Sequence, residues 1–173
     1  MDSDLISDLT NHIDGSFDCE LEVGNCNATL TETIEAWDVP MDIKRLFQWN
    51  WFNAEVDGLS HYLMSVEQIV AEEDLERFMA DGLLQIGSCQ NGDMVAVDLR
   101  DERAAVHFVS HDELWEDDGP SPRGCAVLIH RSLAEFLLRL AEQRYIPIDS
   151  CSGDDYRRVV DEMTGGCNAG EGQ

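Results

Sequence analysis

Gly87 and Gly92 have the spacing of the two glycines in a phosphate-binding loop, and they follow the apolar run LLQI. Such a loop holds phosphate on backbone N–H groups at the start of a helix, and a lysine followed by serine or threonine completes the site. Asp93 and Met94 stand at those two positions, and MVAVDL predicts a strand instead of a helix. Asn91 and Gly92 are typical of a type I′ turn. We therefore predict a β-hairpin with Asp93 capping or hydrating its turn, and no nucleotide site.

Two histidines and two carboxylates lie close together in the sequence as potential metal ligands. His107 and His111 are four residues apart in a predicted strand, and Asp112 and Glu113 follow directly. Residues four apart share a strand face but are separated by about 13 Å along the axis, too far for both to bind one ion. We therefore expect no metal site and no cofactor.

The thiol of Cys89 is the first candidate for a nucleophile, because it falls in the predicted turn. No basic residue flanks it to stabilise a thiolate, and the neighbouring Asp93 is expected to raise its pKa. Ser65 and Ser132 are predicted helix caps, and no G-x-S-x-G motif is present. Because no nucleophile, base and orienting group can be assembled, a hydrolase is the least favoured reading and we predict that the protein is not an enzyme.

The chain is strongly acidic: its 173 residues include 36 Asp or Glu and 11 Lys or Arg, for a formal net charge of -25. Such a charge repels nucleic acid and anionic lipid, and it favours a basic protein partner, a cation or simple solubility. Adaptation to a salty cytoplasm explains it equally well. The six cysteines form no C-x-x-C pair, and no apolar run is long enough to span a bilayer. We therefore expect a cytoplasmic protein with reduced thiols.

Two acidic groups are candidates for a partner-binding surface. Carboxylate runs are most often solvated faces, and the alternative is a surface that recognises a basic protein. Trp115 lies within the second group and is predicted to be an exposed contact anchor, whereas Trp37, Trp49 and Trp51 are expected in the core. The two groups are Glu72, Glu73 and Asp74, and Asp112, Glu113, Glu116, Asp117 and Asp118.

The elements that must position these residues can be predicted from periodicity and capping signals. Pro40 is expected to open a helix that runs to about Trp49. A turn at Asp57 and Gly58 and a strand from Leu59 to Met64 follow. Ser65 and Gln68 form a capping box, which predicts one helix ending at Gly82. A short helix near residues 5–13, one starting at Thr31 and a last one from Asp154 to Met163 complete the helical segments outside the sheet.

Four short runs rich in branched side chains predict a sheet: LLQIGS, MVAVDLR, AAVHFVS and CAVLIH. The first three follow one another closely, which indicates antiparallel hairpins. The acidic segment HDELWEDDGPSPRG is expected to be a loop, and Ser132 with Glu135 predicts the cap of a helix containing Phe136. The fold class is therefore predicted as α+β, a single domain with a mainly antiparallel sheet of about 4–6 strands packed against helices.

The order of several short motifs resembles the SUKH superfamily, which includes the fungal Smi/Knr cell-wall regulators and many bacterial immunity proteins. The matching features are a proline-opened helix in WDVPMDIKRLF, the segment HYLMSVEQIV, a strand ending in IG, a turn ending in GD, a strand ending in VDL, a strand led by Val106, an acidic segment containing Trp115, and SLAEFLLRL. The structural positions that the resemblance implies are Pro40, Gly87, Gly92, Asp93, Asp98 and Phe136.

The resemblance covers Thr31 to Arg144, and the family's usual asparagine–glycine pair has no clean match in WNWFNAEVDG. We therefore expect an N-terminal extension over residues 1–30, a SUKH-like domain over 31–146, and a short helix with a flexible tail over 147–173. The resemblance implies a non-enzymatic module that neutralises a toxin, often a nuclease. The alternative is a regulatory or scaffold domain without a toxin partner, and the oligomeric state is left open.

Overall fold

The computed structural model describes residues 23–24, 27–39, 41–49, 51–52, 56–58, 61–89, 92–116 and 119–141. Several predictions therefore fall on residues outside this part of the chain, namely the helices near residues 5–13 and 154–163, the tail, and the residues Pro40, Asn91, Asp117 and Asp118. None of the helices in the described part is both long and apolar enough to cross a membrane.

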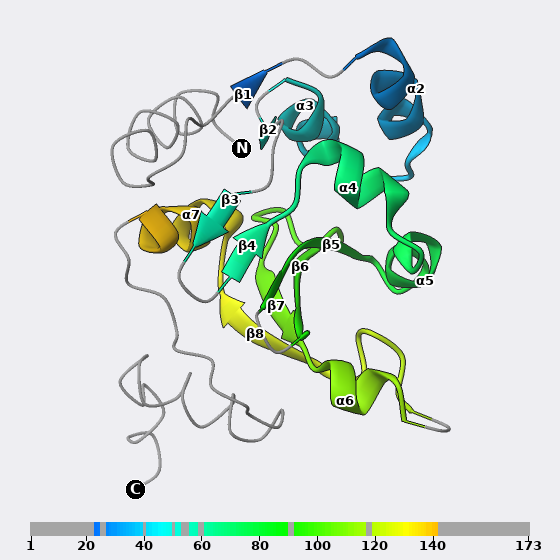
Figure 1. Ribbon diagram of the computed structural model, residues 1–173, viewed down its shortest axis with the longest axis vertical. Helices are drawn as coiled ribbons and strands as arrows, with labels where there is room; N and C mark the ends of the chain where they lie inside the picture. Colours follow the sequence, from blue (N-terminus) through cyan, green and yellow to red (C-terminus); the bar gives the residue numbers. More distant parts are fainter. Residues whose placement is uncertain are drawn as a thin grey trace, which may run out of the picture.

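Six strands form one antiparallel sheet in which each strand pairs with the next along the chain (Figure 1). The predicted α+β class and hairpin connections are confirmed, and the four longer strands are the four predicted from the sequence. The strands are β3 (Val56–Gly58), β4 (His61–Leu63), β5 (Leu83–Cys89), β6 (Met94–Asp98), β7 (Val106–Val109) and β8 (Ala126–His130).

The first hairpin of this sheet lies two residues later than predicted. Asp57 and Gly58 belong to β3 and are not a turn, because Gly58 pairs with His61 in β4. The chain therefore reverses between Gly58 and His61. The observed strand β4 is shorter than the predicted strand from Leu59 to Met64. Its residue Leu63 pairs with Gly87 in β5.

A small second sheet and two helices precede the main sheet. Strand β1 (Val23–Gly24) pairs with β2 (Trp51–Phe52), and the helices are α2 (Ala28–Ala36) and α3 (Met41–Trp49). Helix α2 begins earlier than predicted because the Asn27 side chain accepts a hydrogen bond from the Leu30 N–H at 3.0 Å. The rings of Trp37 and Trp51 both contact Phe47, and both indoles are buried as predicted. The side chain of Trp49 lies outside the described residues.

The segment after Ser65 forms two helices, α4 (Val66–Ala71) and α5 (Leu75–Ala80), where the sequence predicted one. The capping box of Ser65 and Gln68 is confirmed. The prediction of a single helix was wrong, because the backbone leaves the helix at Glu72 (φ -65°, ψ 128°). Phe78 of α5 joins a second cluster, whereas Ile69 of α4 joins the larger core. The chain turns between them at residues 72–74. Gly82, with φ +74°, ends α5 as predicted.

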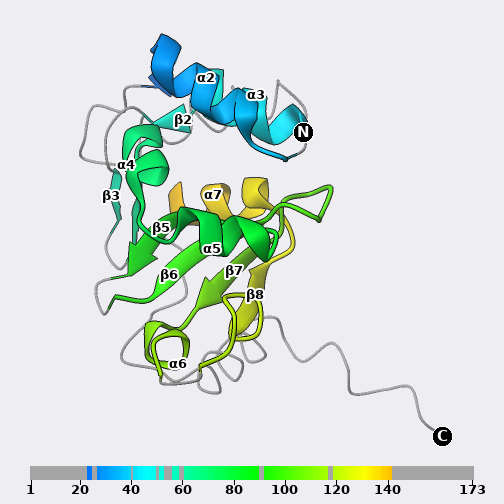
Figure 2. The same ribbon diagram turned by 90° about the vertical axis from the view of Figure 1, so that its right-hand side faces the viewer.

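The sheet is buried on both faces, which explains why its strands are almost continuously apolar. Val95 and Val97 of β6 belong to the larger core cluster, whereas Met94 and Ala96 belong to the second. The larger cluster also holds residues of α2, α3, α4 and α7 (Leu133–Ala141). In Figures 1 and 2, α2 and α3 lie at one end of the molecule, and the short helix α6 (His111–Leu114) lies at the other.

The hairpin between β5 and β6 is confirmed, but its turn is one residue longer than a type I′ turn. The Cys89 N–H donates to the Asp93 carbonyl at 2.7 Å, and the Gly92 N–H donates to the Cys89 carbonyl at 3.0 Å. Gly92 has φ +94° and is the last residue of the loop. This is the geometry of a three-residue hairpin loop that needs a left-handed residue at its end. Gly87 lies in β5 next to a bulge that leaves Ile86 outside the β5–β6 register.

Candidate functional site

Helix α6 begins the segment HDELWEDDGPSPRG, which the sequence predicted to be a loop directly after the strand AAVHFVS. Ser110 is its N-cap, and the Ser110 hydroxyl accepts from the Glu113 N–H at 3.4 Å. The Ser-x-x-Glu spacing was the signal that could have predicted it. His111 is therefore the first residue of a helix, and the expectation that His107 and His111 share a strand face is wrong.

His111 lies between two carboxylates, one buried and one exposed. Its Nδ1 lies 2.7 Å from Asp93 Oδ1, and its Nε2 lies 3.1 Å from Asp112 Oδ1. The same Asp93 oxygen accepts from the His111 backbone N–H at 2.9 Å. The expected capping or hydration of its own turn by Asp93 stays a prediction, because Gln90 and Asn91 lie outside the described residues. The structure places the Asp93 carboxylate at the start of α6. The hairpin turn thereby positions the acidic segment that follows His111.

Helix α5 holds α6 from the other side through Arg77. The Arg77 guanidinium donates from Nη2 to the Leu114 carbonyl at 3.3 Å, and its Cζ lies 5.1 Å from the centroid of the Trp115 ring. The side chain of Leu114 packs with Phe78 of α5 in the second core cluster. Apolar packing, a hydrogen bond and a cation–π contact therefore join the two helices. We call the surface formed by Arg77, Asp112, Glu113, Trp115 and Glu116 the α5–α6 corner.

Trp115 is exposed at this corner, as predicted, with 57% of its surface accessible. Most exposed apolar side chains need no explanation, but an indole is large and costly to leave in water. Asp112 and Glu116 are exposed beside it in the sequence, and Glu113 is half-buried. The corner thus combines one aromatic ring with several carboxylates. Its role as a contact anchor stays a prediction.

The first acidic group, Glu72, Glu73 and Asp74, lies between α4 and α5. Glu73 is exposed, and Glu72 and Asp74 are half-buried. Partial burial raises the pKa of Glu72, and the neighbouring charges of Asp74 and Glu73 raise it further. Asp74 directly precedes α5, whose last turn contains Arg77. Helix α5 therefore connects the first acidic group to the α5–α6 corner.

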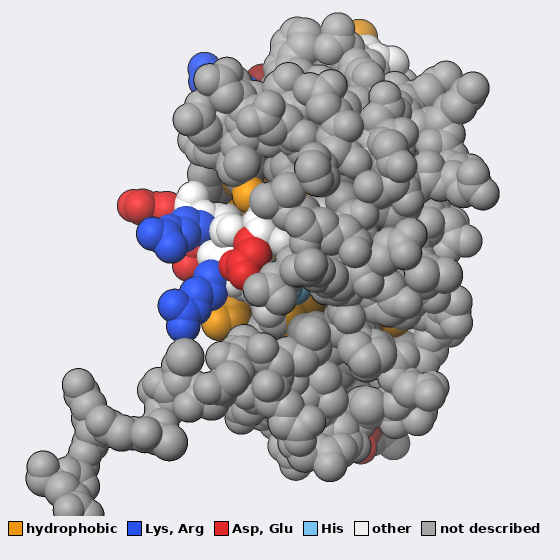
Figure 3. Space-filling view, turned by 90° about the vertical axis from the view of Figure 1, so that its left-hand side faces the viewer, with side chains coloured by type: hydrophobic (Ala, Val, Ile, Leu, Met, Phe, Trp, Pro, Cys, Tyr) orange, Lys and Arg blue, Asp and Glu red, His pale blue; other side chains and the backbone are white. Residues whose placement is uncertain are grey.

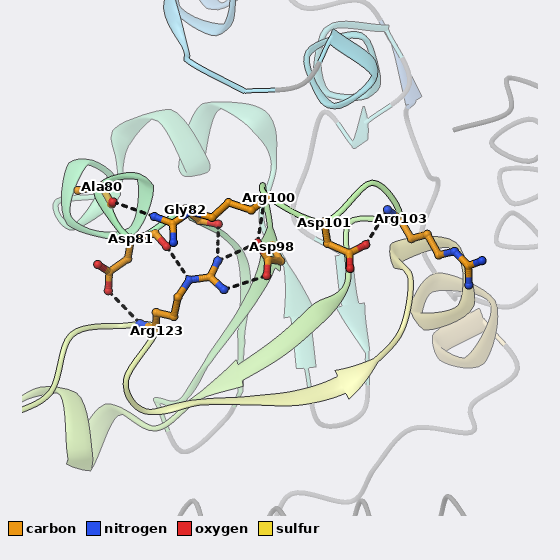
Figure 4. Close-up of polar contacts among 8 residues, drawn as sticks. All are labelled: Ala80, Asp81, Gly82, Asp98, Arg100, Asp101, Arg103 and Arg123. Atoms are coloured by element: carbon orange, nitrogen blue, oxygen red, sulfur yellow. Dashed lines mark hydrogen bonds and ion pairs between the residues drawn. The ribbon is translucent and has the colours of Figure 1, made fainter.

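A charged network surrounds Asp98 at the end of β6, and it serves the fold. The Arg123 guanidinium donates hydrogen bonds to both Asp98 carboxylate oxygens, at 2.7 and 2.9 Å (Figure 4). It also donates to the backbone carbonyls of Asp81 and Gly82. Burial raises the pKa of Asp98, but the bonds from Arg123 and from the Arg100 N–H outweigh this and hold the pKa below its ordinary value. Asp98, one of the structural positions that the family resemblance implies, therefore joins the end of β6 to Arg123.

Phe136 and Cys89 are core residues. Phe136 is buried in α7, with its ring 5.5 Å from that of His130. Burial raises the pKa of the Cys89 thiol well above its ordinary value, and the charge of Asp93 adds to the effect, as expected. A buried protonated thiol is a poor nucleophile. In the part of the chain that the structure describes, no three His, Cys, Asp or Glu side chains are grouped to hold a metal ion.

On the side of the molecule away from α5 and α6, only part of the surface belongs to described residues (Figure 3). Figure 3 shows described Lys or Arg side chains next to carboxylates there, around apolar atoms. Among the described residues, the α5–α6 corner combines carboxylates with an exposed indole, that of Trp115.

The chain matches no protein-family model and no curated protein.

Proposed function

We propose that the protein is a non-enzymatic binding module that neutralises a basic toxin in the cytoplasm of the cell that makes it, as the SUKH resemblance implies. The observation that carries the proposal is the exposed Trp115 ring among the carboxylates of the α5–α6 corner. Aromatic anchors surrounded by charge complementary to the partner are typical of tight protein interfaces. A nuclease is the toxin class that fits best, because its nucleic-acid groove is basic.

The charge of the whole chain supports the same proposal. A net charge of -25 accelerates encounter with a basic protein and competes with nucleic acid for a basic groove. Long-range attraction alone is unspecific, since the Debye length is about 8 Å at physiological salt. Specific binding requires a local surface, and the α5–α6 corner supplies one that is fixed to the core through Leu114.

The test compares two charge-reversal variants of equal net charge. The first carries Asp112→Lys and Glu116→Lys of the corner, and the second carries Glu32→Lys and Glu102→Lys elsewhere; all four side chains are exposed. The probe is the basic toxin domain encoded next to the gene, and calorimetry at 50 and 300 mM NaCl measures binding. We expect the first variant to lose about 100-fold in affinity and the second less than about 5-fold.

Each other outcome has a definite meaning. Equal losses in both variants would show that bulk charge acts without a local surface, and they would contradict the assignment of the corner. A neighbouring partner that binds with no dependence on salt would favour the regulatory or scaffold alternative. Absence of any toxin-like partner, together with no protection of cells that express the neighbouring reading frame, would overturn the proposed function.

A further inference from the structure

We propose that His107 and the ion pair of Asp98 with Arg123 form an acid-sensitive switch, in which a proton taken up by the His107 ring releases Arg123 from the end of β6. The inference concerns a conformational change inside the fold that depends on pH. It does not rest on the proposed function, because no partner takes part in it.

His107 lies beside Asp98 on one face of the sheet. Strands β6 and β7 pair Ala96 with His107, and the Asp98 N–H donates to the Ala105 carbonyl at 2.8 Å. Asp98 follows Ala96 by two residues in β6 and therefore shares its face. Diagonal neighbours of this kind are about 7–8 Å apart, within reach of long side chains. On the other side of His107, its partner in β8 is the uncharged Leu128.

The ring nitrogen Nδ1 of His107 is buried, and no group in the described part of the chain forms a hydrogen bond with it. Buried polar atoms are almost always paired, so an unpaired one needs a physical reason. A neutral imidazole can leave one nitrogen without a hydrogen, whereas an imidazolium carries N–H on both and needs an acceptor for each. The arrangement around Nδ1 therefore favours the neutral ring.

The charges around His107 act on it in opposite directions. Burial lowers the pKa of His107, the negative charge of Asp98 raises it, and the positive charge of Arg123 lowers it. The backbone of Ala105 and the charge of Asp101 also raise the pKa, but the net direction is downward. Arg123 weakens the attraction of the ring to Asp98, because it bonds both oxygens of that carboxylate.

Proton uptake and release of Arg123 must therefore favour each other. When Arg123 leaves, the ring loses a repelling cation and the Asp98 carboxylate becomes available to an imidazolium, so the ring binds a proton more tightly. By linkage, a proton on the ring then weakens the hold on Arg123 by the same factor. The bonds that open are those of the guanidinium to Asp98 and to the carbonyls of Asp81 and Gly82 (Figure 4). Acid therefore loosens the contact between the end of α5 and the segment that leads into β8.

The carboxylates of this network titrate in a lower range of pH. The pKa values of Asp98 and Asp81 are both lowered from 3.8. Both groups stay ionised between pH 7 and pH 5, whereas an ordinary histidine titrates near 6.5. A change in the bonds of Arg123 within this range is therefore due to a histidine.

The first test follows the His107 imidazole of the full chain by NMR from pH 7.5 to 4.5, with the signal assigned by its loss in His107→Gln. We expect a titration midpoint below 6.5. Arg123→Gln should raise the midpoint, because it removes the repelling cation, and Asp98→Asn should lower it, because it removes the attracting carboxylate. If neither variant moves the midpoint, or if both move it in one direction, the inference is wrong. If Arg123→Gln does not fold, Asp98→Asn provides the decision.

The second test measures the release of Arg123 by hydrogen exchange. The Arg123 backbone N–H, which donates to Asp81 Oδ2 at 3.0 Å, is compared with that of Phe108 in the buried sheet. We expect the protection factor of Arg123 to fall about 5-fold between pH 7 and pH 5 and to stay below that of Phe108. In His107→Gln it should stay constant. Equal protection of Arg123 and Phe108 would show that Arg123 opens only when the whole protein unfolds, which contradicts a local switch.

His130→Gln is the matched control. His130 is a second buried histidine of the same sheet, and its ring packs against Phe136, a member of the larger core cluster. This variant should keep the response of Arg123 to acid. His107→Leu removes the same titration as His107→Gln and replaces that variant if it does not fold. A response that persists without His107, or that disappears without His130, would overturn the inference.

Discussion

One carboxylate oxygen of Asp93 contacts both the backbone and the ring of His111, at 2.9 Å from its N and 2.7 Å from its Nδ1. Asp93 closes the β5–β6 turn through its own carbonyl, which accepts from the Cys89 N–H. A single residue therefore joins the hairpin to the first residue of α6, 18 positions later. The α5–α6 corner depends on this link, since His111 begins the helix that ends at Trp115.

We predict that Asp93 and His111 are energetically coupled. Asp93→Ala and His111→Ala should each lower the free energy of unfolding by about 1–3 kcal/mol, because the first removes the acceptor of the His111 backbone N–H and both remove the contact between the carboxylate and the ring. The double variant should lose about 1–2 kcal/mol less than the sum. Urea unfolding of the four proteins measures this coupling, and losses that add within about 0.3 kcal/mol would show that the contact contributes nothing.

The bond between Asp98 and Arg123 should make stability depend on pH. The pKa of Asp98 is lowered from 3.8 in the folded protein, so its contribution is fully present above that pH and is lost as pH falls through the lower folded value. Asp98→Asn should cost about 1–2 kcal/mol at pH 7, a modest figure because a third of the Arg123 side chain is exposed.

The measurement is urea unfolding of wild type and Asp98→Asn between pH 7 and pH 3. The difference between the two proteins should be constant above about pH 5 and shrink below pH 3.8. Glu102→Gln, at an exposed carboxylate, is the control and should track the wild type. A difference that stays constant down to pH 3 would contradict the role assigned to the Asp98 charge.

Two glycines with positive φ should respond differently to alanine. Gly92, at φ +94°, has room for a methyl group, because the nearest atoms are those of the His111 ring at 3.7 Å. Gly82, at φ +74°, has the Arg100 Nε only 2.3 Å from the position of a Cβ. We expect Gly92→Ala to cost about 1 kcal/mol from the backbone alone.

Gly82→Ala should cost a few tenths of a kcal/mol more than Gly92→Ala, because the exposed Arg100 side chain must also swing aside and give up its 3.5 Å bond to the Ala80 carbonyl. Thermal unfolding of the two variants under identical conditions provides the comparison. Equal losses in melting temperature would mean that displacing Arg100 costs no stability, and they would contradict this prediction.

The thiols of Cys89 and Cys125 should react only when the protein opens. Burial raises the pKa of both, with Asp93 adding to the effect at Cys89 and Glu113 adding to it at Cys125. We expect iodoacetamide at pH 8 to modify these two residues at least 100-fold more slowly than in urea, as followed by mass spectrometry of the digested protein. Rapid labelling of Cys89 in the folded protein would reopen the question of a nucleophile at the hairpin.

The sequence predicts the sheet better than the corner, and the reason is the range of the interactions involved. Strands β5 to β8 follow from local apolar runs, and the Ser65 cap follows from a residue three positions away. Helix α6 has only four residues, which are too few to be stable alone, so contacts from Asp93 and Arg77 sustain it. The helical spacing of apolar residues also predicted one helix where α4 and α5 are separate. That spacing does not show that Ile69 and Phe78 belong to different core clusters.

The candidate residues divide in the same way. The exposure of Trp115 could be predicted from its acidic surroundings in the sequence. Its contact with Arg77 could not, because it joins α5 to the end of α6 across the β5–β7 strands. Asp98 matched the family pattern, but the sequence did not predict its ion pair with Arg123. Arg123 follows 25 residues later in a proline-containing segment.

The sequential order of the strands has a consequence for how the chain acquires this structure. Every strand of the main sheet can pair as soon as its neighbour along the chain has been made, so loop-closure entropy stays low at each step. Arg123, by contrast, bonds groups 25 to 42 residues earlier. We infer that the hairpins assemble first, during synthesis, and that the guanidinium of Arg123 locks the finished sheet to the end of α5 as one of the last events of folding.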